Sequence, residues 1–260
     1  MRRTTPHCTF VAREQQKLLR ALTRPGIDLS EVAHTLEAFV TPERAARLRS
    51  VFAARVGSVT AVMDSPHDPH NGAAVIRSCD AFGVPRLHVV EAREAFLVSN
   101  TVSRGSERWV EIRTYASTPS AVETITQAGY ELVATHPEGE LSPNELASVP
   151  RLALVLGNER QGISEELRGA CSRSVRIPMR GFAESLNVSV TAAILLQHAT
   201  AGRPGDLSTA EQLSLYARAL VLTVPHAPEV LAARGVSVGG AAETGSVEER
   251  AGSLLPTSPG

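Results

Sequence analysis

The sequence has few of the residues on which several protein classes depend. Its 260 residues include only three cysteines, Cys8, Cys79 and Cys171, and a single lysine, Lys17. An odd number of widely spaced cysteines argues against a disulfide framework or a zinc site and fits a reducing compartment. No apolar run is long enough to span a membrane, and the N-terminus lacks the apolar segment of a signal peptide. We therefore expect a cytoplasmic protein with no membrane association and no metal.

An excess of one charge is also missing, because the formal net charge is −1. This balance excludes a chain that binds nucleic acid through overall basicity. The charge is nevertheless uneven along the chain. Residues 1–55 hold ten basic and five acidic residues, whereas residues 204–260 hold three basic and six acidic ones. The basic N-terminal segment predicts an anionic partner at that end of the molecule.

The apolar pattern changes near residue 56. Before it, apolar residues recur at helical spacing, and Thr41-Pro42-Glu43 is typical of a helix start. From residue 56 to residue 203, short apolar runs alternate with helical stretches, which predicts an α/β domain with a largely parallel sheet. The expected strands are 59–63, 87–90, 110–112, 132–134, 152–156 and 175–177, and the expected helices are 71–82, 119–128, 164–171 and 188–201.

A third segment, 204–260, follows a run of glycine and proline. Ser208 can cap a helix that extends to Leu222, with Glu211 at the capping-box position. Beyond about Gly235 the composition of Gly, Ala, Ser, Glu and Pro predicts a disordered tail. We therefore expect helical extensions on both sides of the α/β domain.

A first group of polar residues lies in the predicted helix that follows the first strand. Its sequence is NGAAVIRSCDAFG, beginning at Asn71. Asn71 can cap the first turn, and Arg77 lies off the apolar stripe of the helix. Taken alone, the two residues are a cap and a solvated surface charge. The functional alternative is an arginine directed at a phosphate.

A second group follows the apolar run 152–156 and has the sequence GNERQGIS, beginning at Gly157. The Lys-Ser/Thr pair of a phosphate loop is missing, and G-x-G-x-x-G occurs nowhere in the chain, so a nicotinamide dehydrogenase is disfavoured. Gly157 would allow a ligand to approach the backbone closely. Glu159 is either a charge at the start of a helix or a polar anchor in a site.

A third group lies in the stretch from Ile177 to Gln197, IPMRGFAESLNVSVTAAILLQ. The alternation around Ile177 predicts a short strand that ends at Pro178, and the apolar residues from Val188 predict a buried helix. Ser185 and Asn187 lie in the loop between them. They could cap the helix, or they could bind a ligand, since such loops often do in α/β proteins.

Together these groups resemble the motifs of the SpoU/TrmH family of SPOUT RNA methyltransferases in their order, residue identities and spacing. The resemblance covers roughly residues 56–200. It is carried by Asn71 and Arg77; by Gly157, Asn158, Glu159 and Gly162; by Ile177, Pro178, Ser185, Leu186, Asn187 and Ser189; and between the motifs by Gly105, Ser106 and Trp109.

The resemblance implies a fold and an activity. The fold would be a parallel α/β sheet with helices on both faces and a C-terminal deep trefoil knot, in a homodimer. The activity would be 2′-O-methylation, with S-adenosylmethionine, of a guanosine ribose in the D-loop of tRNA, at position 18. A ribosomal RNA target and an RNA-binding protein without catalysis stay open as alternatives.

The resemblance also implies roles for single residues. The catalytic set is Arg77, Asn71, Glu159, Ser185 and Asn187, and the cofactor would contact Thr135, Gly157, Ile177, Met179 and Leu186. Because a guanidinium stays protonated, we expect Arg77 to fix a phosphate and stabilise the developing alkoxide. We expect RNA contacts from the basic N-terminal segment, including Arg20, and from Arg104 and Arg108.

Overall fold

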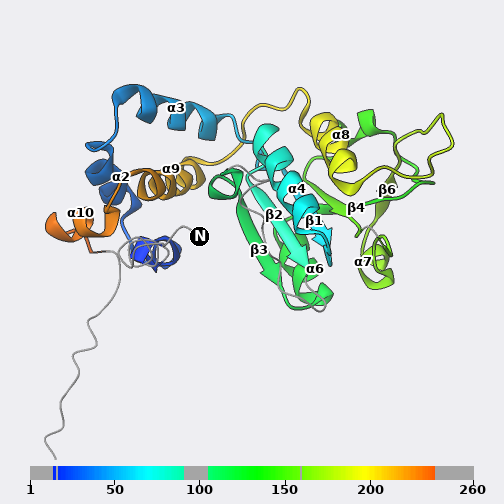
Figure 1. The fold of residues 1–260 in the computed structure, drawn as a ribbon, viewed down its shortest axis with the longest axis horizontal. Coiled ribbons are helices and arrows are strands. Elements are labelled where there is room, and N and C mark those ends of the chain that lie inside the picture. Colours follow the sequence, from blue (N-terminus) through cyan, green and yellow to red (C-terminus); the bar gives the residue numbers. More distant parts are fainter. Residues whose placement is uncertain (1–13, 16, 91–104, 159, 238–260) are drawn as a thin grey trace, which may run out of the picture.

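The computed structural model describes residues 14–15, 17–90, 105–158 and 160–237. These residues form two units that lie side by side, an α/β unit and a smaller helical unit (Figure 1). In the part of the chain so described, no helix is long and apolar enough to cross a membrane.

The α/β unit is built on one sheet of six strands, all parallel, in the order β3-β2-β1-β5-β4-β6. The strands are β1 (Val59–Asp64), β2 (Arg86–Val90), β3 (Glu111–Tyr115), β4 (Glu131–Thr135), β5 (Leu152–Leu156) and β6 (Arg173–Val175). Every residue of the neighbouring strands β1 and β5 is buried. Strands covered on both faces lose the alternation of polar and apolar residues, which explains their continuous apolar runs.

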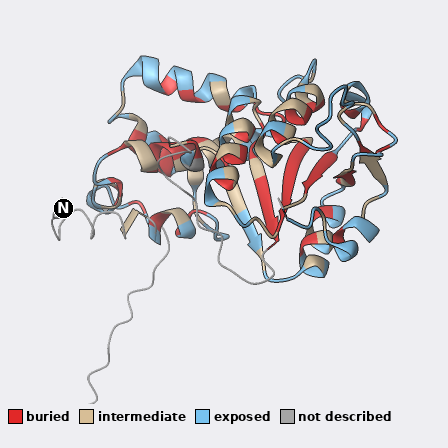
Figure 2. Ribbon diagram, turned by 45° about the vertical axis from the view of Figure 1, so that its right-hand side comes forward, coloured by how far each residue is buried: buried red, intermediate tan, exposed pale blue. Residues whose placement is uncertain are grey.

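Helices cover both faces of this sheet. On one face lie α4 (Pro69–Ala81), the 3₁₀ helix η2 (Pro143–Ser148) and α8 (Val188–Thr200), and on the other lie α6 (Thr118–Gln127) and α7 (Glu165–Gly169). The alternate residues Leu154 and Val155 of β5 belong to the two different cores. Figure 2 shows the central strands as buried between the helices. The predicted α/β fold with helices on both faces is confirmed.

The helical unit joins the two ends of the described chain. It contains α2 (Leu29–Glu37), α3 (Pro42–Ala53), α9 (Thr209–Thr223) and α10 (Ala227–Ala233). Leu36, Phe52 and Leu220 belong to one buried cluster, so the N-terminal and C-terminal helices share a core. The sequence predicted α2, α3 and α9 but neither their association nor α10. The predicted disordered tail lies mostly in residues 238–260, outside the described residues.

Three expectations about the α/β unit need correction. Strand β6 ends at Val175, two residues earlier than expected, because its neighbour β4 ends at Thr135, the residue paired with Val175. The backbone N–H of Arg176 instead donates to the carbonyl of Leu141 (3.0 Å). Strand β3 begins one residue later than expected and extends to Tyr115. Helix α8 is buried along one side only, and Val190 on its other side is 45% exposed.

A buried ion pair joins the two units. Arg55, just after α3, is only 1% exposed, and its guanidinium donates to the carboxylate of Asp80 on α4 (2.6 Å) and to the carbonyl of the same residue (3.2 Å). The other carboxylate oxygen of Asp80 accepts from the hydroxyl of Ser106 (3.2 Å). The returning chain crosses the same junction at Gly205, where a Cβ atom would lie 1.8 Å from the carbonyl oxygen of Ala53.

Candidate active site at the carboxyl edge of the sheet

Three loops leave the sheet side by side at its carboxyl edge. They follow β5, β4 and β6, which are neighbours in the sheet, and begin near Gly157, His136 and Arg176. In parallel α/β sheets the loops at this edge form the ligand site. Two of the three polar groups predicted from the sequence lie in these loops.

The loop after β5 folds back on itself. Asn158 and Gly162 exchange backbone hydrogen bonds of 3.0 and 3.1 Å, and the side-chain oxygen of Asn158 accepts from the N–H groups of Arg160 (3.0 Å) and Gln161 (2.7 Å). A Cβ atom on Gly157 would lie 2.3 Å from the carbonyl carbon of Gly162. Glycine is therefore required at 157 by the close approach of the chain itself, which the sequence pattern had attributed to a ligand.

A buried carboxylate that the sequence reasoning missed holds the end of this loop. Asp64 is the last residue of β1, is almost completely buried, and accepts from the backbone N–H of Ser164 (2.7 Å). Ser164 in turn caps α7. The sequence did offer a signal for this contact, because an acidic residue ends a strand that is otherwise largely apolar. A carboxylate that is buried at such a position needs hydrogen-bond partners.

The first and third predicted motifs meet through their asparagines. The side-chain amide of Asn187 donates to the side-chain oxygen of Asn71 (3.1 Å), although the residues are 116 positions apart. The oxygen of Asn187 accepts from the backbone N–H of Ser189 (2.8 Å), so Asn187 is also the N-cap of α8. Asn71 is not a cap, contrary to expectation, because α4 is capped by Asp68, which accepts from the N–H of His70 (2.8 Å).

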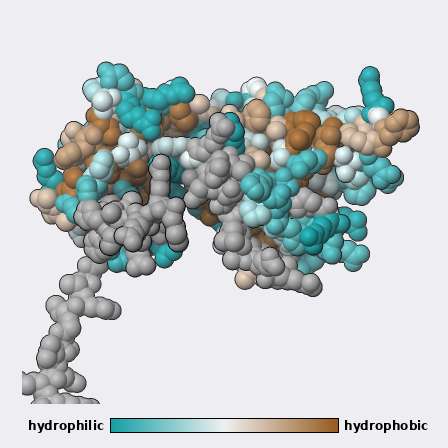
Figure 3. Space-filling view, viewed as in Figure 1, coloured by the Kyte–Doolittle hydropathy of each residue, from teal (hydrophilic) through white to brown (hydrophobic). Residues whose placement is uncertain are grey.

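Arg77 is exposed on α4, two turns along the helix from the Asn71–Asn187 contact. It forms no ion pair within the described residues. It lines a shallow hollow between α4 and α8 whose other walls are Ala74, Ser78, Ala81, Phe82, Ser189, Val190, Ala193 and Ile194. Figure 3 shows apolar side chains gathered at the surface over α8. An unpaired guanidinium beside an apolar surface can bind a phosphate while the surface is covered by a partner.

Known proteins are similar to this chain in sequence and in fold. The model of the SpoU rRNA Methylase family matches residues 58–197. The chain belongs to this family. The tRNA (guanosine(18)-2′-O)-methyltransferase of Escherichia coli K12 is 32% identical over 161 residues, which cover 62% of this chain and 70% of that protein.

Two solved structures extend the comparison. The Aquifex aeolicus TrmH/SpoU tRNA modifying enzyme is 29% identical with a TM-score of 0.62, covering 70% of this chain and 96% of that one. The AdoMet-bound rRNA methyltransferase from Sinorhizobium meliloti is 30% identical with a TM-score of 0.51, covering 58% of this chain and 59% of that one. The resemblance inferred from the motifs is confirmed.

Within this SpoU fold, the residues expected at the cofactor lie on the three neighbouring loops. Thr135 ends β4, Ile177 packs against the core, Leu186 is half-buried and Met179 is 38% exposed. Among the described residues, the backbone N–H groups from Ile177 to Asn187 donate to no other protein group. A segment with so many unpaired donors is open to water or to a ligand.

The residues expected at RNA are only partly described. Arg20 is exposed on a helical turn of the helical unit, and Arg108 is exposed at the end of the 3₁₀ helix η1 (Ser106–Arg108). The following Trp109 packs on the helical core, and the guanidinium of Arg44 lies 6.0 Å from the centre of its ring. Arg104 and Glu159 lie outside the described residues.

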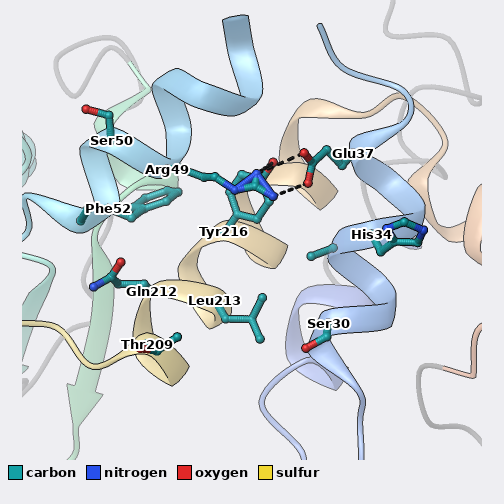
Figure 4. Close-up of a pocket in the computed structure, with 12 residues that line it drawn as sticks. Ser30, His34, Glu37, Arg49, Ser50, Phe52, Thr209, Gln212, Leu213 and Tyr216 are labelled. Atoms are coloured by element: carbon teal, nitrogen blue, oxygen red, sulfur yellow. Dashed lines mark hydrogen bonds and ion pairs between the residues drawn. The ribbon is translucent and has the colours of Figure 1, made fainter. Parts of the chain in front are cut away.

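A further hollow, of about 540 Å³, lies between α2, α3 and α9 in the helical unit (Figure 4). At its rim the guanidinium of Arg49 donates to both carboxylate oxygens of Glu37 and to the hydroxyl of Tyr216 (3.1 Å). It contains none of the residues predicted for the site. This polar clamp instead ties together the three helices that form the unit.

Proposed function

We propose that the protein transfers a methyl group from S-adenosylmethionine to the ribose 2′-hydroxyl of guanosine 18 in the D-loop of tRNA. The hydrogen bond between Asn71 and Asn187 is the observation that carries this proposal, because it joins the helix of Arg77 to the loop after β6. The activity of the Escherichia coli relative and the tRNA modifying enzyme from Aquifex aeolicus support a tRNA substrate.

The residues at the carboxyl edge suit this cofactor. The unpaired N–H groups of residues 177–187 can bind the polar edge of an adenine, and Ile177 and Leu186 offer apolar contacts. Thr135, Gly157 and Met179 complete the set that we assign to the cofactor. When bound, S-adenosylmethionine supplies a methyl group already activated by its sulfonium.

The task left to the protein is to orient a ribose hydroxyl and stabilise the oxygen as its proton leaves. The guanidinium of Arg77 is proposed to bind the phosphate beside the target ribose through its fork of donors and to stabilise the developing negative charge. Asn71 and Asn187 hold the two motifs together, and Ser185 and Glu159 are assigned to the target nucleotide and the loops. Holding the hydroxyl in line with the methyl group lowers the entropic part of the barrier.

We also propose the C-terminal knot of the family. Its support is a close crossing of two segments next to β6. Leu141 bridges to Val175, and a Cβ atom on Gly139 would lie 2.4 Å from the carbonyl carbon of Val175. Residues 176–187 continue from this crossing, and α8 then returns to pack against α4 and η2.

A homodimer through the α4–α8 hollow is the proposed quaternary structure. The exposed Val190 and the half-buried Ile194 beside Arg77 would be covered by the partner, which brings Arg77 to a subunit interface. Val190→Glu should give a monomer in sedimentation velocity that binds the cofactor but methylates RNA poorly. If the variant remains dimeric, the dimer interface must lie on another surface of the protein.

RNA docking is assigned to the helical unit and to η1, in the cytoplasm. Arg20, Arg44, Arg47 and Arg108 are exposed, and we add Arg104 from the sequence. Phosphate contacts of this kind are sensitive to salt. The affinity for tRNA should therefore fall steeply between low and moderate ionic strength.

One experiment tests the activity directly. The purified chain is mixed with labelled S-adenosylmethionine and an unmodified tRNA transcript, and the methylated nucleotide is mapped. We expect one 2′-O-methylguanosine at position 18, and none in a transcript with 2′-deoxyguanosine there. Methylation of a ribosomal RNA fragment instead would favour the other substrate class, and cofactor binding without transfer to either RNA would contradict the proposal.

A further inference from the structure

The loop after β6 carries a fully exposed phenylalanine. Phe182 lies between the end of β6 and the N-cap of α8, and its side chain touches nothing in the described chain. Among the described residues, no other large hydrophobic side chain is as exposed as Phe182, although Met179 in the same loop is 38% exposed. Because solvent exposure of a phenyl ring forfeits the free energy of burial, such a residue is expected to meet a partner.

The charges around Phe182 indicate which partner. Arg176 and Arg180 are exposed in the same loop, and neither forms an ion pair within the described residues. Arg173, by contrast, is held by Glu131 at 2.6 Å. An exposed aromatic ring in the same loop as two unpaired guanidinium groups is a combination with which proteins bind unpaired nucleotides. The ring stacks on a base, and the cations contact phosphates.

The position of the loop connects it to the proposed chemistry. Phe182 precedes Ser185 by three residues, and the loop ends at Asn187, which contacts Asn71 on the helix of Arg77. We propose that Phe182 stacks on an unpaired base of the RNA substrate near the methylated ribose, and so selects single-stranded or looped RNA. This inference rests on the proposed function in taking the substrate to be RNA.

Another copy of this chain is a less suitable partner for the loop. The apolar hollow that we assign to the dimer is lined by residues of α4 and α8 and does not include Phe182. A symmetric contact through Phe182 would also bring Arg176 and Arg180 toward their own copies in the partner. Like charges at short range oppose such a contact.

The test compares Phe182→Ala, Phe182→Trp and wild type. Phe39 at the end of α2 is also exposed, so Phe39→Ala is the matched control. Loss of one base stack should raise the dissociation constant for an unmodified tRNA transcript about five- to a hundredfold, and Phe182→Trp should restore it. The fluorescence of Phe182→Trp should also be quenched on adding RNA, relative to wild type, whose single tryptophan is Trp109.

Three outcomes would overturn the inference. They are an unchanged RNA affinity in Phe182→Ala, a shift to monomer in sedimentation velocity, and a weakened affinity for S-adenosylmethionine. The last two would assign Phe182 to the dimer or to the cofactor. The affinities are measured without turnover, so they are independent of the modified position. A wild-type protein that binds tRNA and leaves guanosine 18 unmodified would contradict the proposed function alone.

Discussion

The two units of the molecule bury their apolar residues in different ways. The α/β unit is one continuous stretch of chain, and its central strands β1 and β5 are buried at every position. The helical unit is assembled from both ends of the chain, so that Leu36 and Leu220 share a core although almost the whole α/β unit lies between them in sequence. The first unit is specified largely by local patterns, whereas the second depends on contacts between helices that lie far apart in the sequence.

This difference has a functional counterpart. The motifs of the family lie in the α/β unit, and the exposed arginines Arg20, Arg44 and Arg47 lie in the helical unit. The chemistry would thus lie in the α/β unit, whereas RNA docking would use both units, which Arg55 and Asp80 join. A substitution that destabilises one unit should therefore leave the structure of the other unit largely intact.

The largest expected effect concerns the pair that joins the units. Asp80→Asn would leave the guanidinium of Arg55, which is 1% exposed, without its counter-charge. Leaving a buried charge unpaired costs about 3–5 kcal/mol of unfolding free energy. In urea we expect this variant to unfold in two transitions, with the helical unit unfolding first, as followed by the fluorescence of Trp109, which packs on the helical core.

Arg55→Met is the matched variant. It should lose less stability, because Asp80 is 27% exposed and can be hydrated when its partner is absent. The double variant Arg55→Met with Asp80→Leu should also be more stable than Asp80→Asn alone. Equal losses in the two single variants would mean that burial of the charge is not the cause.

The units should also differ in how they respond to pH. In the α/β unit, the pKa of His88 is lowered to about 4, first by burial and then by Arg86 and Arg113. The unfolded chain takes up this proton near pH 6.5, so stability falls as the pH drops from about 6.5 to 4, by up to about 3 kcal/mol. His88→Gln should flatten this part of the profile, whereas the exposed His34→Gln in α2 should not.

In the helical unit, we expect stability to depend on pH in the alkaline range. Burial, and after it the nearby Glu37, raises the pKa of Tyr216 to about 12 from an ordinary value of 10. The stability that the protonated phenol contributes is fully present below pH 10 and is lost as the pH rises through 12. Tyr216→Phe should reduce this alkaline loss, as measured by thermal melting between pH 9 and 11. An unchanged alkaline profile would assign the loss to another group.

The same contrast explains how much the sequence could predict. Strands β1, β2, β4 and β5 were expected from apolar runs, because a buried parallel strand is a local pattern. The edge strands β3 and β6 are less buried, and their bounds differ from the expected ones. The pairing of Asn71 with Asn187 was not, since no pattern within the sequence records a contact across 116 residues. For Asp64 the sequence offered an acidic residue at the end of a predicted strand, but not its partner Ser164, which lies 100 positions away.

The helical unit was predicted less completely. Helices α2, α3 and α9 were expected from apolar spacing and from the capping residues Thr41 and Ser208. Their common core was not, since each helix alone shows only that it has an apolar side. Helix α10 is seven residues long and follows His226, whose backbone is in the left-handed region (φ 56°) and whose side chain does not cap the helix. The proline and Glu229 in its first turn were the signal that the sequence offered.

The substitution Arg77→Lys tests the methyl-transfer step separately from RNA binding. A lysine keeps the charge but not the fork of donors, so we expect kcat for tRNA methylation to fall about a hundredfold with unchanged cofactor affinity. Arg44→Ala in the helical unit should instead raise KM for tRNA and leave kcat almost unchanged. Arg168→Lys, on α7 at the opposite face of the sheet, is the control. Near-full turnover of Arg77→Lys would mean that a point charge suffices.

The smallest expected effect concerns the clamp of the helical unit. Arg49 binds Glu37 at 2.5 Å, and its guanidinium lies 4.3 Å from the centre of the Tyr216 ring, but both charged side chains are substantially exposed. Exposed pairs contribute about 0–1 kcal/mol, so Glu37→Gln should cost at most about 1 kcal/mol. A double-mutant cycle with Arg49→Gln would isolate the coupling between the two residues.

Local stability is the more sensitive measure of this clamp. Since α2 is held in the unit by its packing and by Glu37, its amides should exchange hydrogen faster in Glu37→Gln, while those of β1 and β5 should not change. Faster exchange in both units would show that they open together. The clamp would then stabilise the whole molecule, and the two units would behave as one cooperative body despite their different construction.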